Sequence, residues 1–206
     1  VLVNWTADAR LDVPRRLCRL RLCNASNARV YKLVLRAGRR VLPYWLTGTD
    51  GGLLERPLQA DQAYLAPAQR LDILVDFSTV RPGTEVLLLG ADYDPMENDG
   101  GAAAADPLLE HPGAPPMGAE QVLLRLRVSA GEARVARLPP RLSKLPDVDF
   151  TAASRRPMKL WINDAGRWLI NDWNFHLDHH ASGFEVRRGS REIWELTNAI
   201  RSMPHP

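Results

Sequence analysis

The feature that most constrains this chain is a period-two alternation of apolar and polar residues. In the segment LDILVDF every second side chain is apolar, namely Leu71, Ile73, Val75 and Phe77. The same pattern recurs in three further segments: CRLRL (18–22), YKLVL (31–35) and QVLLRLRV (121–128). Successive side chains of a β-strand point to opposite faces of the sheet, so these segments are predicted to be half-buried strands.

Turn signals separate the alternating segments, among them NASN (24–27), TDGG (49–52), RPG (81–83) and AGE (130–132). Short alternating strands with such spacing are typical of a β-sandwich or a β-barrel. We expect the apolar sides of the strands to form one core, which includes Leu20, Leu22, Leu33, Leu35, Ile73, Val75, Leu124 and Leu126.

Two segments interrupt this pattern. Residues 94–118 are rich in glycine, proline and alanine and predict a long surface excursion, with room for a short helix at 107–110. Residues 138–157 contain several prolines and predict an interdomain linker, because proline cannot donate a ladder hydrogen bond. We therefore place a domain boundary near residue 150. The strands expected beyond it are MKLWI (158–162), RWLI (167–170), FEVRR (184–188) and EIWELT (192–197), too few to bury a complete core.

Charge and cysteine content exclude several classes of protein. The 27 basic residues nearly balance the 24 acidic ones, and the arginines alternate with apolar residues, which argues against a nucleic-acid interface. No apolar run approaches the roughly 18 residues that a membrane span requires. Cys18 and Cys23 would lie roughly 16 Å apart in one strand, too far for a disulfide.

Six ordered landmarks, together with the end of the chain, resemble the three-domain multicopper oxidases, the family of laccases, cuprous oxidases and bilirubin oxidases. The landmarks are LVN (2–4), RLRLCNASNAR (19–29), GTDGGLLERP (48–57), LAPAQRLDILVDF (65–77), RLSKLP (141–146) and WLINDWNF (168–175). The last segments, EIWELTN (192–198) and MPHP (203–206), are similar to the sequence that precedes a His-x-His-Gly copper motif in that family.

This resemblance implies an all-β fold, a cupredoxin-like Greek-key sandwich plus the opening strands of a second, incomplete one. Residues 1–150 would be the middle, copper-free domain with its linker. Residues 151–206 would be the start of the last domain, truncated at the copper-binding motif. By the same resemblance His205 is a candidate ligand of type 1 copper, a centre that needs two imidazoles and a thiolate. Neither Cys18 nor Cys23 matches the copper cysteine.

The implied parent enzyme oxidises its donor at type 1 copper and reduces dioxygen to water at a trinuclear copper cluster, with four copper ions in all. Its partners would be the remaining cupredoxin domains, O₂ and a phenolic, amine or metal-ion donor, in the periplasm or outside the cell. The chain alone is expected to contain no catalytic or cofactor-binding residue beyond His205, and to be inactive. The alternative is a copper-free cupredoxin-fold protein that serves as a structural or interaction module.

Four details carry other expectations. The family's Asn-Gly turns stand here as Asn4-Trp5 and Asn171-Asp172, and tryptophan does not readily adopt a positive φ. The cluster HLDHH (176–180) offers His176, Asp178, His179 and His180, which we interpret as a solvated loop capable of adventitious zinc or nickel binding.

Trp161, Trp168, Trp173 and Trp194 are expected to pack in sheets instead of lining a substrate groove. Arg70 is expected to form a strand-end hydrogen bond or an ion pair with Asp72 or Asp76.

Overall fold

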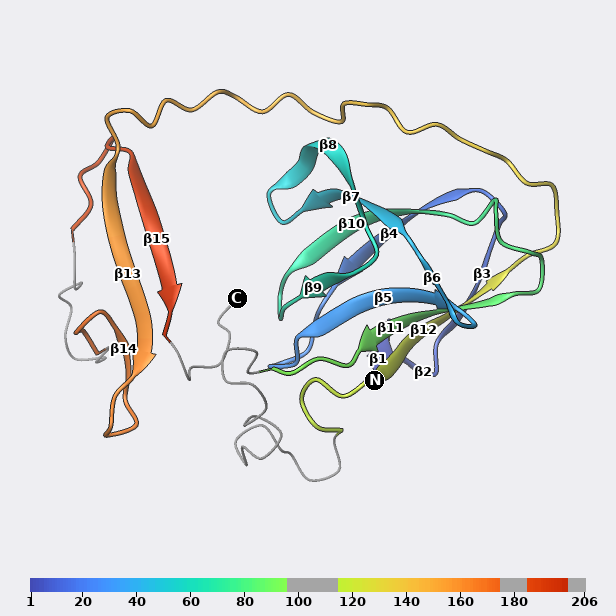
Figure 1. The fold of residues 1–206 in the computed structure, drawn as a ribbon, viewed down its shortest axis with the longest axis horizontal. Coiled ribbons are helices and arrows are strands. Elements are labelled where there is room, and N and C mark those ends of the chain that lie inside the picture. Colours follow the sequence, from blue (N-terminus) through green and yellow to red (C-terminus); the bar gives the residue numbers. More distant parts are fainter. Residues whose placement is uncertain (96–114, 175–184, 200–206) are drawn as a thin grey trace. The chain divides into compact units, whose positions relative to one another are not determined.

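The computed structural model describes residues 1–95, 115–174 and 185–199 of the chain (Figure 1). These residues contain fifteen strands and no helix, which confirms the predicted all-β class. Among them, no helix is long and apolar enough to cross a membrane. The described residues form two compact units: the first holds Val1–Asp94 and the described residues up to Leu145, and the second begins at Pro146. The helix expected at 107–110 lies outside the described residues.

The first unit is built from two sheets and a short hairpin. One sheet has the strand order β4 (Leu17–Cys23), β10 (Arg70–Asp76), β7 (Tyr44–Thr49) and β8 (Gly52–Ala60). The other has the order β3 (Arg10–Val13), β12 (Gln121–Val128), β11 (Glu85–Ala91), β5 (Tyr31–Ala37) and β6 (Arg40–Leu42), with β9 (Ala63–Leu65) also paired to β5. The pairs within both sheets are antiparallel except β3 with β12. The hairpin consists of β1 (Leu2–Val3) and β2 (Thr6–Ala7).

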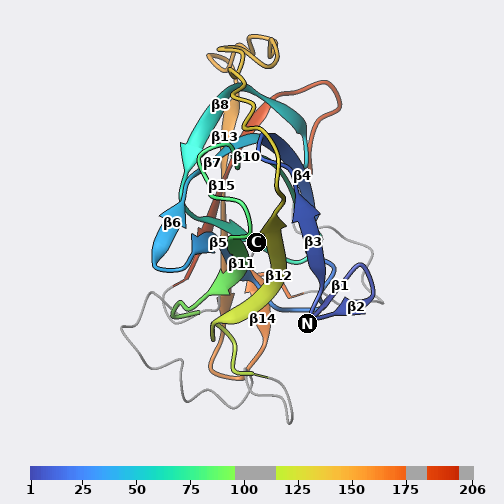
Figure 2. The same ribbon diagram turned by 90° about the vertical axis from the view of Figure 1, so that its right-hand side faces the viewer.

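The chain passes repeatedly from one sheet to the other, as the two layers in Figures 1 and 2 show. It crosses after β3, β4, β6, β8, β9 and β10. The inner faces meet in one cluster of buried side chains, whose largest fully buried members include Tyr44, Phe77, Leu35 and Ile73. The Tyr44 hydroxyl donates a hydrogen bond of 3.1 Å to the Leu33 carbonyl oxygen, which satisfies the one polar group of that side chain.

The predicted core is confirmed for most of its residues. Leu33, Leu35, Ile73, Val75 and Leu126 are buried, and Leu20, Leu22 and Leu124 are half-buried against the same cluster. The prediction that β12 alternates throughout is wrong at its start, where Leu123 is buried and Val122 is exposed. The register between β11 and β12 shifts between Leu88 and Leu89. This bulge inserts one residue into β12 and reverses which of its side chains face the core.

The tight turn of the first hairpin differs from the expectation about Trp5. Asn4 and Trp5 have φ angles of 48° and 64°, so the tryptophan does adopt the left-handed region that two-residue hairpins favour. Its side chain is 93% exposed. Asn171 also has a positive φ, of 55°, and takes the conformation for which glycine is usual.

Gly48 occupies a bulge in β7 where no side chain fits. A Cβ at this position would lie 2.9 Å from the Gly52 carbonyl oxygen and 3.2 Å from Cβ of Asp72. We expect Gly48→Ala to lower the free energy of unfolding by about 1–3 kcal/mol, because a backbone atom must shift. Gly51 is the matched control, since a Cβ there meets nothing within 4 Å. Urea unfolding of both variants tests this, and a Gly48→Ala protein as stable as Gly51→Ala would contradict the crowding.

The linker is held to the first unit along β8. The Leu142 amide donates a hydrogen bond of 2.8 Å to the Glu55 carbonyl oxygen, and the Ser143 hydroxyl donates one of 3.0 Å to that of Leu54. Arg141 forms an ion pair with the Glu55 carboxylate. The RLSKLP landmark therefore covers part of the β8 edge of the first sheet.

The described part of the second unit is a single sheet with the order β14 (Trp168–Ile170), β13 (Ser154–Ile162) and β15 (Glu192–Asn198). It confirms the strands expected at MKLWI, RWLI and EIWELT. The strand expected at FEVRR is wrong for Glu185–Arg188, which form no ladder, and Phe184 lies outside the described residues. Trp168 and Trp194 are 44% and 47% exposed, so each side chain is partly covered, and the packing expected of the tryptophans stays a prediction.

Candidate metal centre

The histidines that the sequence singled out cannot be placed. All five histidines of the chain, His111, His176, His179, His180 and His205, lie outside the described residues. Within 1–95, 115–174 and 185–199, no group of three His, Cys, Asp or Glu side chains is arranged to hold a metal ion. The assignments of His205 as a copper ligand and of HLDHH as a solvated loop therefore stay predictions.

Both cysteines are free, as predicted, and both belong to β4. Cys23 is exposed and Cys18 is half-buried, and burial raises the pKa of the Cys18 thiol. A thiol with a raised pKa is less often the thiolate that copper requires. Neither cysteine belongs to a group of three possible metal ligands among the described residues.

The strand that precedes His205 is well defined up to Ala199. β15 pairs in parallel with β13 over seven residues, from Ser154 opposite Glu192 to Leu160 opposite Asn198. The Ala199 amide then donates a hydrogen bond of 3.0 Å to the Leu160 carbonyl oxygen. The position of the chain is therefore set by β13 as far as Ala199.

Asn171 ties the end of β14 to the middle of β13. Its side-chain oxygen accepts a hydrogen bond of 2.8 Å from the Lys159 amide, and its backbone amide donates one of 2.7 Å to the Lys159 carbonyl oxygen. The Trp161 indole N–H donates to the Asn171 carbonyl oxygen. The WLIND part of that landmark therefore stabilises the strand on which β15 is aligned.

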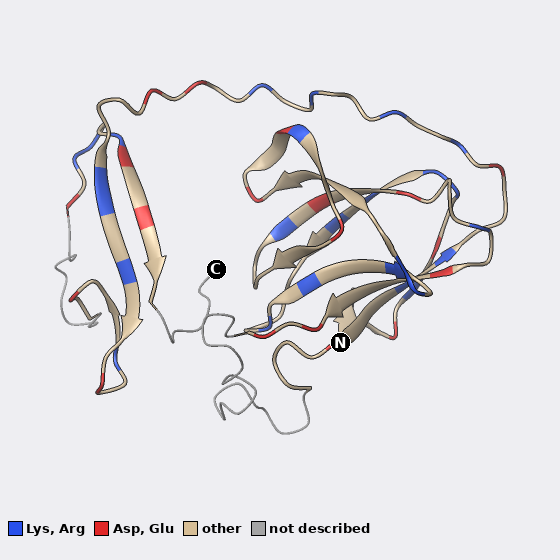
Figure 3. Ribbon diagram, viewed as in Figure 1, with Lys and Arg blue, Asp and Glu red and all other residues tan. Residues whose placement is uncertain are grey.

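Opposite charges are divided between the two parallel strands. Figure 3 shows basic residues along β13 and acidic residues along β15. Arg156 binds the Glu192 carboxylate through two hydrogen bonds, of 2.8 Å and 2.7 Å, and Arg155 forms an ion pair with Glu195. The Trp194 indole N–H donates a further bond of 2.8 Å to Glu192. The Arg156 guanidinium, and after it the Trp194 indole, lower the pKa of Glu192 to about 2.

This depressed pKa predicts the pH dependence of the second unit. The carboxyl titrates near pH 4.5 when unfolded and near pH 2 when folded. A group with a lowered folded pKa stabilises the fold above its unfolded value, and the stabilisation is lost as the pH falls through the folded value. We expect an NMR titration of the Glu192 side-chain carbon to give a midpoint near pH 2. A midpoint at the ordinary value would show that the Arg156 contact is not formed in solution.

A buried asparagine explains two landmarks of the first unit. The Asn24 side-chain N–H₂ donates to the carbonyl oxygens of Arg29 and Leu65, at 2.7 Å and 2.9 Å. Its side-chain oxygen accepts hydrogen bonds from the amide and hydroxyl of Ser26. The Ala68 amide donates to the Asn24 carbonyl oxygen at 2.8 Å. NASN and LAPAQ are therefore two halves of one turn structure.

Charged residues on the adjacent strands are also structural. Asp72 on β10 binds Arg19 on β4, which lowers the pKa of the Asp72 carboxyl, and it accepts a weaker hydrogen bond from Thr47. Arg70 does form the expected ion pair and strand-end hydrogen bond, but its partner is Asp50, at 3.0 Å and 2.9 Å. Asp50 lies in the turn between β7 and β8, and β7 is a neighbour of β10 in the sheet, whereas Asp72 is paired with Arg19.

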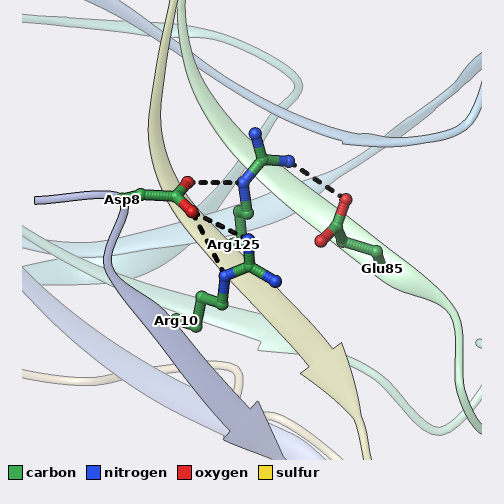
Figure 4. Close-up of polar contacts among 4 residues, drawn as sticks. All are labelled: Asp8, Arg10, Glu85 and Arg125. Carbon is green, nitrogen blue, oxygen red and sulfur yellow. Dashed lines mark hydrogen bonds and ion pairs between the residues drawn. The ribbon is translucent and has the colours of Figure 1, made fainter.

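A shallow groove on the second sheet of the first unit carries a dense charge cluster (Figure 4). Asp8 binds both Arg10 and Arg125, and Arg125 also reaches Glu85 at 3.2 Å. The bonds from Arg10, followed by those from Arg125, lower the pKa of Asp8. The arginines that line this groove are equal in number to the neighbouring carboxylates, which are those of Asp8, Asp12 and Glu85. The cluster therefore lacks the excess positive charge that an anion site requires.

The ion pairs of β13 and β15 are the feature that the sequence alone did not identify. Their partners lie 36 and 40 residues apart, so no local pattern joins them. The available signal for these ion pairs in the sequence was a pair of adjacent arginines at the start of one strand and two glutamates three residues apart in another.

Comparison with curated proteins gives relatives along the whole chain. No protein-family model matches. The chain is 34% identical over 210 residues to multicopper oxidase LPR1 homolog 5 of Oryza sativa subsp. japonica, covering 96% of this chain and 30% of the relative. It is 31% identical over 216 residues to a laccase of Bacillus subtilis (strain 168), covering 100% of this chain and 37% of that enzyme.

A shorter match is closer in sequence. Cell division protein FtsP of Edwardsiella tarda (strain FL6-60) is 49% identical over 78 residues, which are 38% of this chain and 16% of FtsP. The chain thus spans 16% to 37% of the length of these three relatives.

The solved structures agree with these relatives. The crystal structure of the McoA multicopper oxidase from Aquifex aeolicus matches with a TM-score of 0.68 and 29% identity, over 82% of this chain and 33% of that one. The Oryza sativa relative and this solved structure are both named multicopper oxidases, the Bacillus subtilis relative is named a laccase, and the described residues have the all-β fold of the solved structure. The chain is therefore similar to multicopper oxidases and laccases along its whole length.

Proposed function

We propose that this chain is the scaffold segment of a copper-dependent oxidase that couples one-electron oxidation of a small donor to the reduction of dioxygen to water. The observation that carries the proposal is β15, a strand that is held in parallel register on β13 and that precedes His205 in the sequence. The similarity to a laccase and a multicopper oxidase along the whole chain supports it.

Within this proposal the two units have different roles. Residues 1–150 form the middle, copper-free cupredoxin domain with its linker, and residues 151–206 begin the last domain. His205 is the first imidazole of the type 1 copper site. Copper, when bound, supplies one-electron redox chemistry at that site. The contribution of the described residues is to fix the strand that precedes this histidine in the sequence, through the β13 ladder and the Asn171 hydrogen bonds.

The partners follow from the same proposal. The donor is a phenol, an amine or a metal ion such as cuprous ion, and the rest of the last domain together with the remaining cupredoxin domains supplies the other copper ligands. The protein acts in the periplasm or outside the cell, where dioxygen and such donors are accessible.

Oxygen uptake by the full-length protein that carries this segment tests the activity. We expect copper-loaded protein to oxidise a phenolic dye or cuprous ion with four donor equivalents consumed per O₂ and no hydrogen peroxide released. The copper-free protein is the control. Absence of oxygen uptake with every donor class, in protein shown to hold its copper, would overturn the assignment.

A second candidate is a copper-free structural or interaction module. The local identity of 49% to a protein named for cell division favours it, because that match exceeds the identity to the oxidases. Metal analysis separates the two candidates. Full-length protein purified from copper-supplemented cells without stoichiometric copper would support the module and contradict the oxidase.

A further inference from the structure

We propose that two ion pairs, Arg156 with Glu192 and Arg155 with Glu195, together set the register of β15 on β13 and thereby position the segment that carries His205. We call them the register pairs. The part of this inference that concerns His205 rests on the proposed function, whereas the alignment of the two strands does not. The four side chains are positioning residues, because none of them is a candidate metal ligand.

The first register pair has the geometry of a specific contact. The Arg156 guanidinium meets both oxygens of Glu192, at 2.8 Å and 2.7 Å, and donates a further bond of 2.9 Å to the Glu185 carbonyl oxygen. The side chains of Arg156 and Glu192 are 25% and 9% exposed. Bidentate pairing of this kind fixes orientation as well as distance. Glu192 is therefore held at one position along β13.

The second register pair lies on the opposite face of the sheet. Arg155 and Arg156 are adjacent in β13, so their side chains leave the sheet on different sides. Arg155 and Glu195 are 66% and 47% exposed, so this pair is more accessible to water than the first. This pair therefore contributes less to stability than the first, but it also restricts how β15 aligns with β13.

The two pairs reach along the strand in opposite directions. Arg156 lies opposite Trp194, so it reaches two residues back to Glu192. Arg155 lies opposite Ile193, so it reaches two residues forward to Glu195. Each pair alone would tolerate a shift that brought its glutamate directly opposite its arginine. Only the observed register satisfies both.

A shift by two residues in either direction breaks one register pair. If Glu192 moved opposite Arg156, Glu195 would be four residues away from Arg155, and Arg191 would face that arginine with like charge. If Glu195 moved opposite Arg155, Glu192 would be four residues away from Arg156. The apolar pattern of β15 cannot exclude these shifts, because a shift by two keeps every side chain on its face.

The register matters for a metal ligand downstream. A shift by two residues would displace everything after Asn198 by about 6.6 Å along the strand direction, at about 3.3 Å per residue. Metal sites tolerate deviations of only about 0.2 Å in ligand distance. A misaligned β15 would thus remove the imidazole of His205 from its site even if both strands remained paired.

The test uses the full-length protein and two readouts. One is the exchange rate of the Ala199 amide, which bonds to Leu160 only in the observed register. The other is the absorption and electron paramagnetic resonance spectrum of type 1 copper. The variants are Arg156→Gln, Glu192→Gln, the charge exchange R156E/E192R, and Arg155→Gln, whose site is exposed and whose fold is least at risk. Arg167→Gln removes an exposed charge outside the register pairs and is the control.

We expect the Arg156 and Glu192 single variants to speed Ala199 exchange by about tenfold or more and to weaken or alter the copper spectrum. Arg155→Gln should act in the same direction with a smaller change, and R156E/E192R should restore both readouts to within about threefold of the unsubstituted protein. Single variants that behave like Arg167→Gln, or a charge exchange that restores neither readout, would overturn the alignment role.

The outcomes separate this inference from the proposed function. If the unsubstituted protein holds no copper, the proposed function fails and the positioning of a copper ligand fails with it, while the exchange rates still decide the alignment. If the protein holds copper and the single variants exchange faster with an unchanged spectrum, the alignment role stands. In that case the positioning of His205 is wrong, and the proposed function is untouched.

Discussion

Replacing Ile73 by alanine is expected to lower the free energy of unfolding of the first unit by about 2–5 kcal/mol. Ile73 is 1% exposed at the centre of β10, and its neighbours Val75 and Phe77 on the same face are fully buried. The strand is paired on both sides, with β4 and with β7, so it cannot move far to fill the cavity. Loss of buried methyl groups and an unfilled cavity both contribute to this cost.

Urea unfolding followed by tryptophan fluorescence measures the effect. Leu58→Ala is the control, because Leu58 is 58% exposed on the edge strand β8 and its truncation should change stability by less than about 0.5 kcal/mol. An Ile73→Ala protein that unfolds at the same urea concentration as Leu58→Ala would show that the assigned core face of β10 is wrong.

Hydrogen exchange in the 206-residue chain is expected to differ by at least about a hundredfold between β10 and β15. β10 is enclosed between two partner strands and contributes to the main core. β15 has one partner strand among the described residues, and its Trp194 and Leu196 are largely exposed. The backbone hydrogen bonds of β15 can therefore open without unfolding of the main core.

Mass-spectrometric exchange on the chain, with its oligomeric state measured in parallel, makes this comparison. Peptides that cover Glu192–Asn198 should take up deuterium long before those that cover Arg70–Asp76. Equal protection of the two strands in a demonstrated monomer would mean that the second unit already has a complete core of its own.

The sequence predicts the strands of this protein well wherever the alternation is regular. Ile73, Val75 and Phe77 face the core as their spacing indicates, because the ladder between β10 and β4 contains no bulge. The same rule fails in β12, since the bulge opposite Leu88 and Leu89 adds a residue that no period-two pattern contains. Bulges depend on the partner strand, and the partner is not known from a local segment.

The candidate site was accessible from sequence only in part. The motif at MPHP identifies His205 by resemblance, but the side chains that align the preceding strand are revealed by pairing in space. Arg156 and Glu192 are 36 residues apart, and Arg70 and Asp50, whose pairing was likewise missed, are 20 residues apart. Long-range ion pairs are set by the fold and leave no periodic signal in the chain.

The central claim, that this chain aligns a strand to deliver a copper ligand, is tested most directly by His205→Ala in the full-length protein. Without one of its imidazoles, type 1 copper should lose its intense blue absorption, and donor oxidation should stop while the protein stays folded. Copper content, the visible spectrum and the circular dichroism of both proteins are measured together. Loss of the blue absorption with an unchanged fold is the predicted result, and an unaltered blue spectrum in His205→Ala would contradict the account.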